Sequence, residues 1–478
     1  MSYPEGLPIG AGWVPAERTE TIRFPYDGSE VAQAPVGTPA QARAAIDHAV
    51  AAAPRIAALS SRVRRSVLLR VHDAVAQRRA EFEDLLVLET GKPLVDCKVE
   101  VARTLVTLSA AAEEVARLHG ETVPLDLLPS GDGLIGFWTR KPIGVVVGIA
   151  GFNYPLLLAT HKIAPAIAAG CPIVCKPAPQ TPLATLWLLH LVREAAAAEG
   201  APAEIAQLVT GDAEVGSALV TDPRLGAVSF TGSAAVGHRI ARAAAPRKTL
   251  LELGSNAALV VADDADLDAA ADAVLRGGFY ASGQACISVQ RLIVVESVAE
   301  QVLSRVLDRL GEVVVGDPRE EKTRVSALID ERSTRRVLDW IEAARAAGAK
   351  LLAGGSEVDG VIEPTVLADV PDGVDCWDEE IFGPVVCVRT VSDVDEAIDV
   401  VNASRYGLHA SVFTRSLKTA FEAVERLQVG GVVVNEVPGF RSDVMPYGGV
   451  KDSGAGREGP RFAIEELTVT RMAVIRPA

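Results

Sequence analysis

From Gly144 onward the chain alternates short apolar segments with helical segments, and this pattern limits the possible folds more than any other feature. The first apolar segments are GVVVGIA, CPIVCKP, IAQLVTG, LGAVSFTG and KTLLELG. Beyond Ala257 the pattern resumes with ALVVAD, RLIVVES, VVCVRT, ASVFTR and VGGVVVNE. Short apolar strands separated by helices are typical of parallel sheets that helices cover on both faces. The sequence therefore predicts two doubly wound α/β domains of similar size that meet near residues 250–260.

The residues before Gly144 predict helices and one hairpin. Apolar residues recur every three or four positions over 40–53, 64–91 and 98–120, as in amphipathic helices. Residues 121–138 then hold two short extended runs around the turn sequence PSGDG. We expect this segment to form a β-hairpin between the helical and the α/β regions.

The composition excludes several classes of protein. Of the 478 residues, 49% are hydrophobic and 23% are charged, which rules out a disordered chain and suggests about two or three domains. The net charge of −15 argues against a nucleic acid or an anionic membrane as partner and favours a small molecule. The six cysteines form neither a disulfide framework nor a cluster with metal-ligand spacing. We therefore expect no metal site and a reducing, cytoplasmic setting.

Two segments bear on targeting and membranes. The N-terminus MSYPEGLPIGAG lacks a basic region followed by an apolar stretch, so we expect no secretory signal. Residues 142–160 carry no charge and reach the length of a membrane span, but glycines, an asparagine and two prolines interrupt them. We expect a buried strand, a turn and the start of a helix there instead of a membrane span.

Two glycine-rich segments are candidates for phosphate binding. Residues 454–459 match the pattern GxGxxG, but we expect no strand before them, and too few residues follow for a dinucleotide-binding unit. We reject this site. Residues 230–237, FTGSAAVG, follow a predicted strand and open a helix, whose free N–H groups can bind a phosphate. An ordinary strand-to-helix turn is the alternative interpretation.

Several polar residues lie at predicted strand ends or turns. Cys286 follows a helix that breaks at Gly283, on a turn whose N–H groups can stabilise a thiolate, although buried structural cysteines are common. Glu252 lies in an otherwise apolar strand, where burial raises a carboxyl pKa towards the range of a general base. Asn153 follows the strand GVVVGIA, where it can cap the next helix or donate to an oxyanion. Lys176 ends a strand at the edge where α/β sheets bind ligands.

Seven motifs, in order along nearly the whole chain, resemble those of the NAD(P)-dependent aldehyde dehydrogenase superfamily. They are FNYP, the KP turn at Lys176, FTGSAAVG, LELGSN, GQACISVQR, EEIFGPV and MPYGGVKDSGAGREG. The resemblance implies an aldehyde-dehydrogenase-like α/β fold, NAD or NADP as cofactor, and a homodimer or homotetramer. It implies a dinucleotide-binding domain (1–120 and 139–254), a catalytic domain (255–445) and an oligomerisation arm made of the β-hairpin 121–138 and the tail 462–478.

The resemblance also assigns roles to single residues. Cys286 matches the nucleophile of the family, Glu252 the general base and Asn153 the oxyanion amide. The matches to the cofactor site are Lys176 for the adenosine ribose, Gly232, Ser233 and Gly237 for the pyrophosphate, and Glu380 and Phe382 for the nicotinamide ribose.

The implied reaction oxidises an aldehyde to its carboxylic acid through a cysteine thioester, with Glu252 activating the water that releases the acid. Relatives that pass the acyl group to coenzyme A generally lack this base, so Glu252 favours hydrolysis over CoA acylation. A non-catalytic binding protein on the same fold is a further alternative. A serine hydrolase is disfavoured because the sequence holds no GxSxG motif.

Two positions depart from the common pattern of the family. Pro179 stands three residues after Lys176, where relatives that prefer NAD usually have a glutamate that binds the ribose hydroxyls. Without that carboxylate, the site repels a 2′-phosphate less strongly, so we expect NADP to be accepted. Ser255 stands where glycine is more common and affects no proposed catalytic role.

The segments NEVPGFR and MPYGGVKDSGAGREG resemble the branch of lactaldehyde and phosphonoacetaldehyde dehydrogenases. This resemblance implies a small, polar or anionic aldehyde as substrate. The candidate residues for recognising it are Arg103, His161, Arg291 and Arg441. A surface cation or a structural ion pair is the alternative for each of them.

Overall fold

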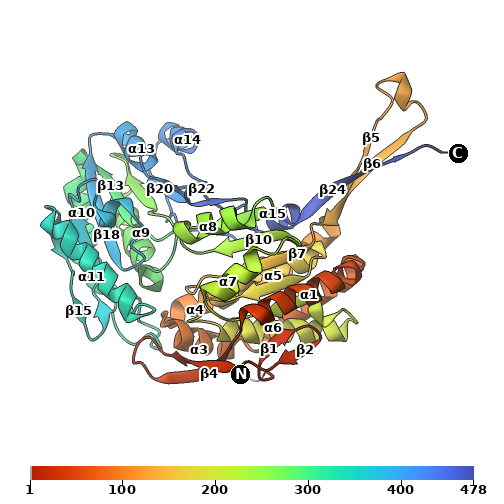
Figure 1. Cartoon of the computed structure of the whole chain (residues 1–478). Helices are drawn as coiled ribbons and strands as arrows, with labels where there is room; N and C mark the ends of the chain where they lie inside the picture. Colours follow the sequence, from red (N-terminus) through yellow and green to blue (C-terminus); the bar gives the residue numbers. More distant parts are fainter. Residues whose placement is uncertain (1–2, 478) are drawn as a thin grey trace.

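The computed structural model describes residues 3–477, which form two α/β bodies and a ribbon that projects from the first body (Figure 1). The chain passes from the first body to the second after Glu252, because the strand that ends there belongs to one sheet and the strand that begins at Ala258 belongs to the other. These residues fall within the range 250–260 proposed above for the domain boundary.

The first body is built on a sheet with the strand order β23-β11-β10-β7-β8-β9. The bounds are β7 (Val145–Ile149), β8 (Ile173–Lys176), β9 (Ala206–Leu208), β10 (Leu225–Thr231), β11 (Lys248–Glu252) and β23 (Gly454–Ala455). Its strands pair in parallel, apart from β23, which is antiparallel to β11. β7 and β8 are buried along their whole length, as the uninterrupted apolar sequence predicts.

The helices of the first body are α1 (Pro39–Ala57), α2 (Ser61–Gln77), α3 (Arg79–Thr90), α4 (Leu94–Glu114), α5 (Pro155–Ala169), α6 (Leu183–Ala198), α7 (Ala213–Val220) and α8 (Ala234–Ala244). The start of α1 is fixed by reciprocal hydrogen bonds between Thr38 and Gln41, which form a capping box. The single helix predicted over 64–91 is wrong. Arg78 leaves the helical conformation (φ −110°, ψ 22°) and separates α2 from α3, although the apolar spacing continues across it.

The second body is built on a sheet with the strand order β14-β17-β18-β13-β12-β20-β21. Its strands are β12 (Ala258–Val261), β13 (Arg291–Val295), β14 (Lys350–Ala353), β17 (Thr365–Ala368), β18 (Val385–Val391), β20 (His409–Phe413) and β21 (Gly431–Val434). Its helices are α9 (Leu267–Phe279), α10 (Glu296–Arg309), α11 (Glu331–Ala346), α12 (Asp375–Asp378), α13 (Val394–Asn402) and α14 (Leu417–Arg426). β14 is antiparallel to β17, and the other neighbours pair in parallel.

Several short elements have no clear counterpart in the sequence pattern. The N-terminal segment forms two antiparallel pairs, β1 (Leu7–Ile9) with β2 (Gly12–Val14) and β3 (Arg18–Arg23) with β4 (Glu30–Val36). The other short pairs are β15 (Glu357–Val358) with β16 (Val361–Ile362) and β19 (Tyr406–Gly407) with β22 (Val450–Lys451). The 3-10 turns are η1 (Val115–Arg117), η2 (Pro129–Gly131), η3 (Ala203–Ile205), η4 (Tyr280–Gly283) and η5 (Leu310–Glu312).

The projecting ribbon consists of β5 (Glu121–Val123), β6 (Ile135–Pro142) and β24 (Thr468–Ile475), in the order β24-β6-β5 (Figure 1). The predicted hairpin therefore exists, but its second strand runs to Pro142. The C-terminal part of the arm begins later than the predicted residue 462, because α15 (Pro460–Glu466) packs on α4 and α5 of the first body. Apolar side chains remain exposed on the ribbon, including Leu127, Leu128, Ile135, Val474 and Ile475.

Two further expectations concern single segments. Residues 142–160 form the end of β6, the strand β7 and the start of α5, and no helix within residues 3–477 is long and apolar enough to cross a membrane. The GxGxxG match at 454–459 is preceded by the short strand β22, contrary to our expectation. Its first two residues form the edge strand β23 instead of a turn before a helix, so the match is no dinucleotide fingerprint.

Candidate active site

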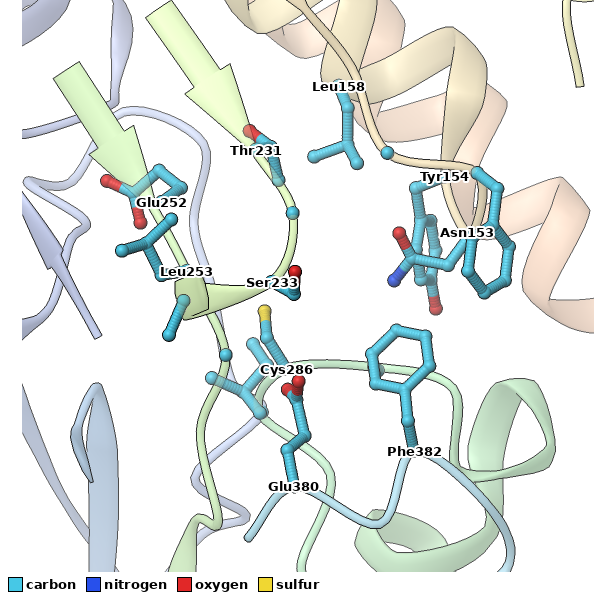
Figure 2. A pocket seen from close by; sticks show the side chains of 18 of the residues that line it. Asn153, Tyr154, Leu158, Thr231, Ser233, Glu252, Leu253, Cys286, Glu380 and Phe382 are labelled. Carbon is cyan, nitrogen blue, oxygen red and sulfur yellow. The ribbon is translucent and has the colours of Figure 1, made fainter. Parts of the chain in front are cut away.

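A cavity of about 890 Å³ lies at the carboxyl ends of strands of the first sheet and is also lined by residues of the second body (Figure 2). Parallel sheets bind ligands at this edge, and the volume is in the usual range for small-molecule sites. The cavity brings together most of the predicted site residues, which are Asn153, Gly232, Ser233, Glu252, Cys286, Glu380, Phe382, Arg103, His161 and Arg441. The predicted residues Lys176, Pro179, Gly237 and Arg291 do not line it.

Cys286 lies on the loop that follows α9 and η4. Ala281 and Ser282 of this loop adopt left-handed backbone conformations (φ 50° and 57°). The loop is held from the first body, because the buried carboxylate of Asp96 in α4 accepts a hydrogen bond of 2.9 Å from the Ala281 N–H. The strained turn and its support from α4 fix the position of the Cys286 sulfur.

The electrostatic surroundings of Cys286 differ from the expected thiolate-stabilising turn. Burial raises the pKa of the thiol to about 12, and the nearby carboxyls of Glu380 and Glu252 act in the same direction. The Tyr447 hydroxyl, 3.3 Å from Sγ, and the Arg441 guanidinium lower it. Burial therefore opposes the thiolate form that the turn was expected to stabilise, and Tyr447 and Arg441 favour it.

Glu252 is the last residue of β11 and is buried. Its Oε2 atom has no hydrogen-bond partner among the described residues. Burial raises the pKa of this carboxyl well above its usual range, and the charge of Glu458 adds to the effect. A buried, unpartnered carboxyl beside a cavity can accept a proton from a water molecule there, which is the chemistry of a general base.

Asn153 lies on the turn between β7 and α5, and its Nδ2 atom donates a hydrogen bond of 2.8 Å to the Gln284 carbonyl. It does not cap α5, whose first N–H groups are instead bound by the buried carboxylate of Glu100. Lys92 pairs with Glu100 and donates to the Asn153 carbonyl at 2.8 Å. Because the amide carries a second N–H, Asn153 can still donate to an oxyanion in the cavity.

The residues predicted to bind pyrophosphate lie at the start of α8. Ser233 is the N-cap residue but makes no side-chain cap, so the first N–H groups of the helix face the cavity beside Gly232. This is a suitable place for a phosphate group. Gly237 is different: a Cβ atom there would lie 2.3 Å from the Leu253 side chain. Gly237 does not line the cavity, and its lack of a side chain permits close packing of α8 against Leu253, just after β11.

Glu380 and Phe382 enter the cavity from the loop after α12 (Figure 2). Glu380 Oε1 accepts a hydrogen bond of 3.0 Å from the Ser255 N–H, and burial raises the pKa of its carboxyl to about 7. Phe382 has a left-handed backbone (φ 50°) and packs edge-on against Phe152, with 5.7 Å between ring centroids. Glu380 and Phe382 therefore present a carboxyl and an aromatic ring to the cavity.

Lys176 is the last residue of β8, and Pro179 follows three residues later, next to Gln180, which lines the cavity. The Lys176 ammonium is buried and donates to the Pro177 carbonyl at 3.4 Å. Burial lowers its pKa to about 8, while Asp212 opposes this shift. Pro179 is exposed.

The four candidate cations separate into two groups. Arg103, His161 and Arg441 line the cavity, whereas Arg291 is buried at the start of β13. Arg291 donates to the Asn256 carbonyl at 2.8 Å and lies over the Trp377 ring. Its predicted role in substrate binding is therefore wrong, since its guanidinium is bound inside the second body.

Two carboxylates that were not predicted from the sequence partly neutralise this corner of the cavity. Asp443 accepts two hydrogen bonds from Arg103, at 2.8 and 2.9 Å, and lies 3.2 Å from His161 Nε2. Burial opposes ionisation of Asp443, but His161 and Arg103 outweigh it and hold its pKa well below the usual range. Glu458 likewise pairs with Lys162 at 3.3 Å and with Arg441 at 3.2 Å. The Arg441 Nε atom is buried, makes no hydrogen bond and lies 3.6 Å from Asp443 Oδ1.

Sequence comparisons agree with this geometry. The profile of the aldehyde dehydrogenase family matches residues 13–473. The chain belongs to the aldehyde dehydrogenase family. It oxidises aldehydes to carboxylic acids with NAD or NADP as acceptor, so the predicted family, fold class and cofactor type are confirmed.

Three similar proteins illustrate the likeness. The 3-sulfolactaldehyde dehydrogenase of Priestia megaterium is 38% identical over 98% of both chains. The structure of aldehyde dehydrogenase 21 from Physcomitrella patens, in complex with the reaction product succinate, has a TM-score of 0.95 and 38% identity, covering 99% of this chain and 98% of that one. A glyceraldehyde-3-phosphate dehydrogenase from Methanocaldococcus jannaschii, in complex with NADP, has a TM-score of 0.92 and 34% identity, covering 96% and 100%.

Proposed function

We propose that Cys286 is the nucleophile of the aldehyde dehydrogenase reaction, with Glu252 as general base and Asn153 as oxyanion donor. The observation that carries this proposal is the meeting of a thiol, a buried unpartnered carboxyl and a side-chain amide around one cavity (Figure 2). The Cys286 sulfur forms a bond to the aldehyde carbon, and the carbonyl oxygen takes the electron pair while Asn153 and the Cys286 N–H donate to it. With a nicotinamide dinucleotide bound, the C–H bond of this adduct would break, the hydride would pass to that acceptor and the oxygen's electron pair would re-form the carbonyl of a thioester. Glu252 then takes a proton from water, whose oxygen attacks the thioester carbon and breaks the C–S bond.

NAD or NADP, when bound, supplies the hydride acceptor. The uncapped start of α8 beside Gly232 and Ser233 fits the pyrophosphate of a dinucleotide, and Glu380 with Phe382 fits the nicotinamide ribose. We accordingly assign cofactor binding mainly to residues 1–120 and 139–254, and the nucleophile to residues 255–445.

We expect the enzyme to accept NADP. No carboxylate stands at Pro179 to repel a 2′-phosphate, and the buried Lys176 ammonium lies at the same sheet edge. Titration of initial rates with both dinucleotides should give KM values within about tenfold of each other, or lower for NADP. Lys176→Met should raise the KM for NADP more than the KM for NAD. Rejection of NADP by about 100-fold in the unmodified enzyme would contradict this expectation.

We further propose that the substrate is a small aldehyde with an acidic group. Three cations, Arg103, Lys162 and Arg441, face two ionised carboxylates in this corner, and the protonated form of Glu252 adds no charge. The Nε atom of Arg441 makes no hydrogen bond and lies 3.6 Å from Asp443 Oδ1, so it can still donate to an acidic group in the cavity. The sulfonate of sulfolactaldehyde and the carboxylate of succinate, bound by relatives, have the chemistry that such a donor recognises.

Arg441→Gln tests this substrate class. A charged hydrogen bond to the acidic group is lost, so the KM for succinate semialdehyde should rise about tenfold or more, while the KM for butyraldehyde, of the same chain length, should change less than about threefold. Both aldehydes are measured with the same enzyme preparation, which serves as its own control for damage to the site. Equal increases in KM for the two aldehydes would show that Arg441 does not bind the acidic group.

We also propose that the chain forms a homodimer or homotetramer in the cytoplasm, through the ribbon of β5, β6 and β24. The exposed apolar residues on this ribbon support the proposal, because projecting apolar surface of this kind is usually covered by a partner. The low cysteine content favours a reducing compartment.

A further inference from the structure

The hydroxyl of Tyr447 has one hydrogen-bond partner among the described residues, the sulfur of Cys286. The Oη–Sγ distance is 3.3 Å, which is within hydrogen-bonding range for sulfur. Tyr447 belongs to the motif MPYGGVKDSGAGREG but has no role in the reaction described above. Its position therefore raises the question of what its hydroxyl does for the nucleophile.

The Tyr447 ring is held firmly in place. Its backbone exchanges two hydrogen bonds with Glu458, of 3.1 and 2.7 Å. The ring is buried against Ile287 and Leu408, and His409 packs edge-on with 5.0 Å between ring centroids. A hydroxyl on such a fixed ring keeps its direction towards the sulfur without losing side-chain freedom at the moment of reaction.

The charges around the pair favour the hydroxyl as donor. The titratable or charged groups that face it are Glu252, Glu380, Arg103, Arg441, Tyr280 and His409. Burial and the neighbouring Cys286 raise the pKa of Tyr447 well above its usual range, so the hydroxyl keeps its proton. The Arg441 guanidinium lies 3.7 Å from the ring centroid, where a cation draws electron density from the phenol and strengthens O–H donation.

We propose that Tyr447 is a catalytic residue, whose hydroxyl donates a hydrogen bond to the Cys286 sulfur and stabilises the thiolate that attacks the aldehyde. This proposal rests on the proposed role of Cys286 as nucleophile. A thiol can either donate or accept in this contact, but a thiolate has no proton, so Tyr447 is then the only possible donor of the two.

The hydrogen bond acts at two points of the reaction without any change in the Tyr447 O–H bond. When the Cys286 S–H bond breaks, the proton leaves to solvent and the sulfur keeps the electron pair, which accepts from Tyr447. When water attacks the thioester, the C–S bond breaks and the electron pair returns to the same sulfur. Tyr447 therefore assists both the attack, by raising the thiolate fraction, and the departure of the sulfur.

Alkylation of Cys286 in the ligand-free enzyme measures this effect without any turnover. Iodoacetamide reacts with the thiolate, and mass spectrometry of the Cys286 peptide follows the rate between about pH 7 and about pH 9. In Tyr447→Phe, the loss of a hydrogen bond to a charged sulfur should raise the pKa of the thiol by about one to two pH units. The alkylation rate at a given pH should then fall about three- to tenfold, since the higher nucleophilicity of the less stabilised thiolate offsets about half of the lost fraction on a logarithmic scale.

Tyr280→Phe is the matched control, because Tyr280 lines the same cavity and the structure shows no hydrogen bond from it to Cys286. It should alkylate within about twofold of the unmodified enzyme. The proposal is wrong if Tyr447→Phe alkylates as fast as the unmodified enzyme, or if both variants slow alkylation equally. An unchanged melting temperature and cofactor affinity exclude misfolding as the cause. Failure of the nucleophile assignment is recognised separately, by activity that survives Cys286→Ala.

Discussion

Cys286→Ala is expected to abolish aldehyde oxidation while leaving the cofactor bound. Removal of the nucleophile eliminates the covalent route, and losses of about 10⁴-fold or more in kcat are usual for such residues. Cys286 is reached from the cavity, whereas the proposed phosphate site at the start of α8 does not use its side chain. Reduced-cofactor absorbance measures the activity, and quenching of protein fluorescence by NAD or NADP measures binding.

The control for this substitution is Cys171→Ala. Cys171 is fully buried and lies outside the cavity, and its thiol donates to the Leu467 carbonyl at 3.4 Å. The same loss of a thiol there should lower stability slightly and leave kcat within about twofold. Dehydrogenase activity of Cys286→Ala above about 1% of the unmodified enzyme would refute the nucleophile assignment.

Glu252→Gln is expected to divide the reaction into a fast first turnover and a blocked second half. The amide has the shape of the carboxyl but cannot take a proton from water, so about one NAD(P)H should appear per active site before the reaction stalls. Steady turnover should fall by about 10²–10⁴-fold. Rapid-mixing absorbance measures the burst and the steady rate in one trace. Steady turnover close to that of the unmodified enzyme would remove Glu252 from the mechanism.

The pH dependence gives an independent check on Glu252. Burial raises its pKa, so the carboxyl is protonated and inactive as a base at low pH. Thioester hydrolysis should therefore increase with pH as Glu252 loses its proton, at a higher pH than for an exposed glutamate. In Glu252→Gln this increase should be absent from the slow steady rate. Addition of coenzyme A provides the control, because rescue of turnover by this thiol would instead favour a CoA-acylating enzyme.

The sequence predicts those parts of the fold that depend on local composition. β7 and β8 are apolar and fully buried, and each is followed by a helix, so their place in a parallel sheet can be inferred. The break at Arg78 could not be inferred, because the apolar spacing of α2 continues into α3. The N-terminal strand pairs are also absent from the prediction, since their residues acquire order from neighbours far along the chain.

The residues of the candidate site also divide into those that the local sequence identifies and those that depend on tertiary contacts. Glu252 could be singled out because a carboxyl inside an apolar strand is unusual, and its unpartnered oxygen is consistent with that reasoning. Arg291 was misplaced because a cation at a strand start has the same sequence signature whether it faces a ligand or a buried carbonyl. Asp443 and Tyr447 were missed because their importance depends on Arg103 and Cys286, to which they are joined only by tertiary contacts.

The start of α4 and the residues just before it contact both the Asn153 turn and the loop before Cys286. Within nine residues, Lys92 and Glu100 hold the Asn153 turn, and Asp96 holds the loop before Cys286. A rotation of the two bodies about their boundary would pull Ala281 away from Asp96 and leave a buried carboxylate without its donor, at a cost of about 1–3 kcal/mol. Through Glu100 and Asp96, α4 therefore keeps the Asn153 turn and the Cys286 loop at a fixed spacing. The position of the Cys286 loop thereby depends on a contact with Asp96, which stands almost two hundred residues earlier in the chain.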